Sequence, residues 1–150
     1  MNGYYDTGVL LKLYTAELES PAVQAFVHYR AQAIQFTELH HAECVSALCL
    51  KQFRGECTAT EVTGALKLLE DDLRAGVLLR VALEWNQVWK QCRCLTEAHA
   101  ALTGCRTLDA IHVACALVLG AREFITSDYR QTPFAIRAGL SVTDPTRAER

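Results

Sequence analysis

Short apolar runs alternate with longer stretches of helical periodicity along this chain. The short runs are typical of buried strands, and residues 2–6, 33–37, 77–82 and 123–126 are the clearest. The triplet LSV near residue 141 predicts an edge strand. The stretches between these runs predict helices, because their apolar residues recur every three or four positions. The expected helices cover residues 8–15, 20–30, 38–54, 58–75, 84–103, 107–119 and 130–138.

Polar residues and glycines mark where these helices begin and end. Thr58 and Glu61 have the spacing of a capping box, in which each side chain bonds the other's backbone amide. Ser20, followed by Pro21, and Thr107 are the other expected N-caps. Glycines are expected to end the helices at Gly55, Gly76, Gly104, Gly120 and Gly139.

The alternation of strands and helices predicts the α/β class. We expect a three-layer α/β/α sandwich with a mainly parallel central sheet, formed as one domain over residues 1–150. In such folds the ligand crevice lies beyond the carboxyl ends of the strands. Asp6 ends the first strand and Asp128 follows a later one. Two acids that are far apart in sequence are therefore expected at one edge of the sheet.

Composition narrows the class of protein. Hydrophobic residues make up 51% of the 150 positions, enough for a sizeable core, and no apolar run reaches the length of a membrane span. The seven cysteines include no CxxC pair, and no secretory signal is apparent, so we expect a reduced, cytoplasmic protein without zinc. The net charge of −2 argues against a large basic surface for nucleic acid and is compatible with a cluster of acids that binds a cation.

Four acids stand at the edges of apolar elements and are the candidate site residues: Asp6, Glu43, Asp109 and Asp128. Each has a plain structural explanation when taken alone. Asp6 suits a helix N-cap, Asp109 favours a helix N-terminus, and Asp128 suits a turn. Taken together, they form a set of oxygen ligands of the kind that holds Mg²⁺ or Mn²⁺. His112 follows Asp109 by three residues and either contacts this site or is a hydrogen-bonded core histidine.

The motifs that carry these acids are YYDTGVLLKLY, AECVSAL, RTLDAIHVACALVLGA and FITSDYRQ followed by AGL. Over about residues 3–140 the chain resembles PIN-domain ribonucleases of the VapC-like toxin kind, and the four acids fall on that family's acidic positions in order. The resemblance implies a metal-dependent endoribonuclease that uses Mg²⁺ or Mn²⁺. It also implies an RNA substrate, a small cognate antitoxin protein and a homodimer. Gly8 departs from the family, which often has Ser there, and Thr7 or Thr126 is the expected substitute for that hydroxyl.

Two other functions stay open at this stage. One is a PIN-fold nuclease with a housekeeping role in RNA processing, and the other is a binding module whose acids hold only a structural ion or a partner. Glu38 and Glu43 lie on one predicted helix, roughly 140° apart around its axis. Because Glu38 can be stabilised by the helix dipole alone, we expect Glu43 and not Glu38 to belong to the site.

Overall fold

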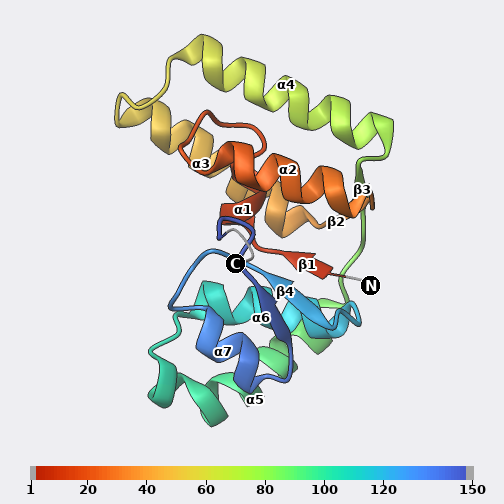
Figure 1. Cartoon of the computed structure of the whole chain (residues 1–150). Helices are drawn as coiled ribbons and strands as arrows, with labels where there is room; N and C mark the ends of the chain where they lie inside the picture. Colours follow the sequence, from red (N-terminus) through yellow and green to blue (C-terminus); the bar gives the residue numbers. More distant parts are fainter. Residues whose placement is uncertain (1–2, 148–150) are drawn as a thin grey trace. The chain divides into compact units, whose positions relative to one another are not determined.

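The computed structural model describes residues 3–147 (Figure 1). The chain divides into two compact units. We call the first the terminal unit, because it combines the start of the chain up to Gly8 with the segment from Leu83 onward. The second, which we call the middle unit, runs from Val9 to Ala82.

A three-stranded parallel sheet forms the centre of the terminal unit. Its strands are β1 (Gly3–Tyr5), β4 (Glu123–Ile125) and β5 (Ser141–Thr143), in the order β1-β4-β5. Tyr5 pairs with Ile125 in the register that aligns the ends of β1 and β4. The Tyr4 and Phe124 rings are fully buried and stacked, with centroids 5.6 Å apart. This packing adds to the backbone pairing of the two strands.

Three helices complete the terminal unit. They are α5 (Trp85–Thr103), α6 (Thr107–Val118) and α7 (Thr132–Arg137). Helix α5 packs against α6, and α7 contacts both α5 and β5 (Figure 1). Every residue from Ala110 to Ala116 is buried, so α6 is surrounded by protein on all its faces over this stretch. Asp109 lies immediately before that buried stretch, where α6 meets solvent.

The middle unit combines helices with a two-stranded parallel sheet. Helix α1 (Thr7–Leu11) leads into it from β1. Helix α3 (Glu38–Phe53) packs against α4 (Ala59–Ala75), and α4 packs against β3 (Leu78–Arg80). The core includes Phe36, Leu48 and Leu69, all buried. The further elements are α2 (Ser20–Arg30) and β2 (Ile34–Phe36).

The α/β class and the parallel strand pairing are confirmed. The strands form two parallel sheets, one in each unit, and LSV supplies the expected edge strand β5. That residues 1–150 behave as a single domain stays a prediction. Among residues 3–147, no helix combines the length and the apolar composition needed to cross a membrane. None of the seven cysteines, all of which lie within residues 3–147, forms a disulfide.

Helix starts were predicted with mixed success. The capping box of Thr58 and Glu61 is confirmed. Ser20 and Thr107 are not N-caps, because Glu19 and Arg106 occupy those positions. The Ser20 hydroxyl instead donates to the Thr15 carbonyl at 2.6 Å, so it stabilises the loop before α2.

A second capping box, which was not predicted, begins helix α3. The Thr37 hydroxyl accepts a hydrogen bond from the His40 amide at 3.2 Å, and the His40 ring accepts one from the Thr37 amide at 3.0 Å. Both residues are buried. A histidine therefore takes the role that Glu or Gln has in the usual motif.

We expect Thr37→Ala to lower the free energy of unfolding by about 1–2 kcal/mol, because it removes the cap of a buried helix end. Urea denaturation followed by circular dichroism measures this change. Thr58→Ala is the matched control and should cost less, because the Thr58 cap is exposed to water. Equal stability of Thr37→Ala and wild type would show that this cap contributes nothing.

Candidate active site

The site is built where β1 and β4 end side by side. Asp6 follows β1, and its amide donates to the carbonyl of Ile125 at 2.9 Å. This bond continues the strand pairing by one residue and places Asp6 beside Thr126. Asp128 lies two residues further along the same loop. Asp6 and Asp128 therefore lie at one edge of the sheet, as expected for neighbouring parallel strands.

Thr126 connects these two acids. Its side chain is fully buried, and its Oγ1 lies 3.3 Å from Oδ2 of Asp6. The same oxygen accepts a hydrogen bond from the amide of Asp128 at 3.0 Å. Oε1 of Gln131 is a second acceptor, 3.1 Å from Oγ1. Since a hydroxyl has one proton, Asp6 and Gln131 compete for it.

Gln131 extends the connection to the third acid. Its side chain is 1% exposed, and its Nε2 donates to the backbone carbonyl of Asp109 at 3.3 Å. Two buried polar side chains, Thr126 and Gln131, therefore link residues Asp6, Asp109 and Asp128. We call this pair the buried link. The sequence suggested Thr126 only as a substitute hydroxyl, and it gave no signal for a role of Gln131.

An arginine accompanies each of two carboxylates at the solvent side. Nε of Arg106 lies 3.4 Å from Oδ2 of Asp109, and Nε of Arg130 lies 3.7 Å from Oδ1 of Asp128. The Asp128 carboxylate also accepts a hydrogen bond from the Arg130 amide at 2.8 Å. The arginines are largely exposed, whereas the two carboxylates are mostly shielded from solvent. Their attraction to the carboxylates is therefore weakened by solvent and salt.

The Cys105 thiol responds to the charge of these acids. Burial raises the pKa of Cys105 to about 12, and the negative charges of Asp109 and Asp128 act in the same direction. Negative potential from both carboxylates therefore reaches one side chain. The thiol stays protonated at neutral pH.

His112 is a hydrogen-bonded core residue. It is 2% exposed, and its Nδ1 lies 2.8 Å from the hydroxyl of Tyr4. Its Nε2 lies 3.4 Å from Oγ1 of Thr7. The structural explanation of His112 is thus supported, and Thr7 is turned toward this core pair. At Gly8 a Cβ would lie 3.2 Å from Oδ2 of Asp6, so a serine there would crowd that carboxylate.

The fourth predicted site residue, Glu43, belongs to helix α3 of the middle unit and is partly buried there. Its role in the site stays a prediction. Glu38 begins the same helix with its side chain 75% exposed, and it pairs with Nη1 of Arg80 at 2.6 Å. This ordinary surface ion pair agrees with the expectation that Glu38 needs no ligand.

The donor types of the terminal unit suit Mg²⁺ or Mn²⁺, since carboxylate oxygens are the ligands these ions prefer. Within residues 3–147, however, no three His, Cys, Asp or Glu side chains come together as a metal-ligating group. The acids therefore have the donor atoms that such an ion prefers, but their side chains are not already arranged as a set of three ligands.

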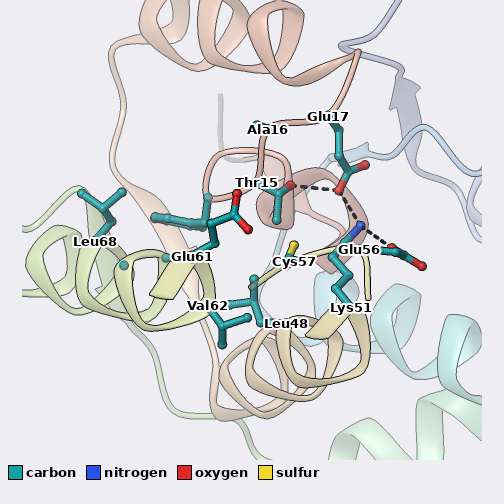
Figure 2. Close-up of a pocket in the computed structure, with 13 residues that line it drawn as sticks. Thr15, Ala16, Glu17, Leu48, Lys51, Glu56, Cys57, Glu61, Val62 and Leu68 are labelled. Atoms are coloured by element: carbon teal, nitrogen blue, oxygen red, sulfur yellow. Dashed lines mark hydrogen bonds and ion pairs between the residues drawn. The ribbon is translucent and has the colours of Figure 1, made fainter. Parts of the chain in front are cut away.

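A separate pocket of about 350 Å³ lies within the middle unit (Figure 2). Leu48, Val62 and Leu68 contribute apolar surface to it. On its polar side, Nζ of Lys51 lies between the carboxylates of Glu17 at 3.2 Å and Glu56 at 3.4 Å. The pocket's charged groups thus satisfy one another.

Hydrogen bonds and charges around the Glu17 carboxyl favour its ionised form. Burial favours its neutral form, but hydrogen bonds from Thr15 and Lys51 and the charges of Lys51 and Lys12 outweigh that effect. They hold the pKa of Glu17 below its ordinary value. Conversely, Glu17 and Glu56 raise the pKa of Lys51 against the effect of burial.

Solved structures of known proteins include ones with a similar fold. No family model matches the sequence, and no curated protein matches it. Among solved structures, the chain is similar to FitAcB from Neisseria gonorrhoeae, with a TM-score of 0.62 and 16% sequence identity. The match covers 95% of this chain and 97% of the other. At this identity the likeness concerns the fold alone.

We expect Lys51→Met to lower the free energy of unfolding at pH 7 by at most about 1 kcal/mol, because the charges are partly solvated. A carboxyl whose pKa is lowered by folding stabilises the protein above its unfolded pKa, and this contribution is lost as the pH falls through the folded pKa. The difference between variant and wild type should therefore shrink as the pH falls below the ordinary pKa of a glutamate. Urea denaturation at a series of pH values measures it.

Lys67→Met provides the matched control, because Lys67 pairs with Asp71 on the exposed surface of α4. It should leave stability unchanged. A Lys51→Met deficit that does not shrink as the pH falls would mean that packing of the lysine stem, and not its charge, stabilises this region.

Proposed function

We propose that this chain is a metal-dependent endoribonuclease. One observation carries the proposal: Asp6, Asp109 and Asp128, from three distant segments, are joined through the buried link at the carboxyl ends of β1 and β4. A buried hydroxyl and a buried amide whose hydrogen bonds are made hold the groups that they join in fixed positions, as a site of converging carboxylates requires. The likeness to FitAcB supports the PIN-like fold from which the proposal starts.

The carboxylates of Asp6, Asp109 and Asp128 would hold the cation. A bound Mg²⁺ or Mn²⁺ supplies Lewis-acid stabilisation of charge on the scissile phosphate and lowers the pKa of a nearby water. The residues of the chain would position the cation and accept a proton. Asp6 is held rigidly by its strand-end hydrogen bond, and a carboxylate of the set accepts the proton of the attacking water.

Arg106 and Arg130 are suited to contact the RNA backbone. Both guanidinium groups are largely exposed, and each lies beside one of the carboxylates. Arginine binds phosphate through paired N–H donors. Two arginines at the site supply the small local positive surface that the net charge of −2 permits.

The finer assignment is the toxin of a toxin–antitoxin pair, acting as a homodimer and inhibited by a small cognate antitoxin. It derives from the resemblance of the sequence motifs. A reading frame for a small protein directly upstream, whose product blocks RNA cleavage when co-purified, would support it. Cleavage without any such inhibitor would favour the housekeeping nuclease.

We expect Asp109→Asn to lower RNA cleavage by at least about a hundredfold, because the amide keeps the shape of the carboxylate but not its charge. Cleavage is measured with Mg²⁺ or Mn²⁺ and, as a control, with excess chelator, which should abolish it in wild type. Arg106→Gln is the matched control for loss of the ion pair at Asp109 and should retain more activity than Asp109→Asn. Wild-type cleavage by Asp109→Asn would remove Asp109 from the site, and no cleavage by wild type would favour a binding module.

We further expect Glu43→Gln to abolish cleavage and weaken Mn²⁺ binding, whereas Glu38→Gln does neither. Glu38 has a surface partner in Arg80 and a favourable place at the start of α3. Calorimetric titration of Mn²⁺ into both variants, with a parallel cleavage assay, measures the difference. If Glu38 were essential and Glu43 dispensable, Glu38 at the start of α3 would be the site residue instead.

A further inference from the structure

Gln131 is a polar residue buried where simple packing would favour an apolar one. Its side chain is 1% exposed, yet both ends of its amide are hydrogen-bonded. Burial of an amide is costly unless its hydrogen bonds are made. The position directly before α7 would also allow its side chain to cap that helix, but it makes no such bond. The side chain is directed instead toward Thr126 and α6.

The chemistry of its partners determines the orientation of the Gln131 amide. A backbone carbonyl can only accept, so the group facing Asp109 must be the NH₂. The oxygen is then directed to Thr126, whose hydroxyl can donate to it. The backbone amide of Gln131 also donates to the Asp128 carbonyl at 3.2 Å. One residue thereby holds the loop after β4 against the first turn of α6.

We propose that Gln131 is a positioning residue of the acidic site, which holds Thr126 and the Asp109 backbone so that the three carboxylates keep their spacing. This inference rests on the proposed function. Gln131 touches no reacting atom, and it acts through its two partners. Gln131 ends the motif FITSDYRQ, but the resemblance assigns it no role.

Gln131 also influences Asp6 through the single proton of Thr126. With Oε1 of Gln131 at 3.1 Å and Oδ2 of Asp6 at 3.3 Å, the hydroxyl proton is shared between two acceptors. Without Gln131, the hydroxyl would donate to Asp6 alone. A carboxylate oxygen that accepts this bond is a weaker ligand for a cation. Loss of Gln131 should therefore weaken cation binding as well as loosen the loop.

The test uses Gln131→Met, which keeps the side chain's length and removes both hydrogen bonds. Gln87→Met, at an exposed position of α5, is the matched control for the exchange itself. Gln131→Asn, which keeps an amide on a shorter side chain, serves as a second variant if Gln131→Met does not fold. Three quantities are measured on the full chain: hydrogen exchange of the Asp128 amide, Mn²⁺ affinity by calorimetry, and kcat and KM for RNA cleavage.

In Gln131→Met we expect faster exchange of the Asp128 amide, which donates to Thr126, and weaker Mn²⁺ binding. The kcat should fall by about tenfold or more while KM changes little, because small misplacement of catalytic groups mainly slows the chemical step. Gln131→Asn should show the same changes to a smaller extent. Gln87→Met should match wild type in all three measurements.

The results separate this inference from the proposed function. If wild type cleaves no RNA, the proposed nuclease activity fails, but faster Asp128 exchange with weaker Mn²⁺ binding still supports the positioning role. Unchanged exchange and unchanged Mn²⁺ affinity in a folded variant overturn it. A lower melting temperature with unchanged kcat and Mn²⁺ affinity also overturns it, because Gln131 would then serve stability alone.

Discussion

The parallel pairing of β1 with β4 is the constraint on which the terminal unit depends. It joins the start of the chain to a segment about one hundred and twenty residues later, through the register that aligns Tyr5 with Ile125. The hydrogen bond from the Asp6 amide to the Ile125 carbonyl extends that pairing to the last position before the loops diverge. A slip of one residue would reverse which side chains face the core, and it would separate Asp6 from Thr126. The site therefore exists only in the register that also buries Tyr4 and Phe124.

The sequence predicted the elements of this fold well because their signals are local. The buried stretch of α6 appears as AIHVACA, and the glycines that follow helices α4 and α5 adopt the expected left-handed conformation. Strand identities followed from apolar content, and the triplet LSV marked the edge strand β5. Caps were harder to predict. Ser20 and Thr107 have the right residue type, but their neighbours take the cap positions. A cap depends on backbone angles that composition alone does not determine.

The site was predicted only in part, because only some of its residues have a local signal in the sequence. The acids at strand and helix ends could be identified from their apolar surroundings and from the resemblance. The buried link could not, because Thr126 and Gln131 have no periodic signal and their partners lie on other elements. Gln131 in particular occupies a stretch, SDYRQT, that resembles any polar loop. Its importance follows only from its burial and from the two groups that its amide contacts.

The ion pairs at Asp109 and Asp128 are weak enough for each carboxylate to exchange its arginine for another partner. Asp109 and Asp128 are each paired with an arginine that remains largely in water, so neither ion pair is strong. On the protein side, the same residues are held by backbone bonds to the buried link, which water does not weaken. If a cation takes over the carboxylates, as the proposed function requires, both guanidinium groups lose their present partners. They then lie beside the site with donors available for phosphate, the group that an RNA chain brings with it. The weak ion pairs on the solvent side thus leave the carboxylates able to bind a cation, while the hydrogen bonds to the buried link keep Asp109 and Asp128 in place.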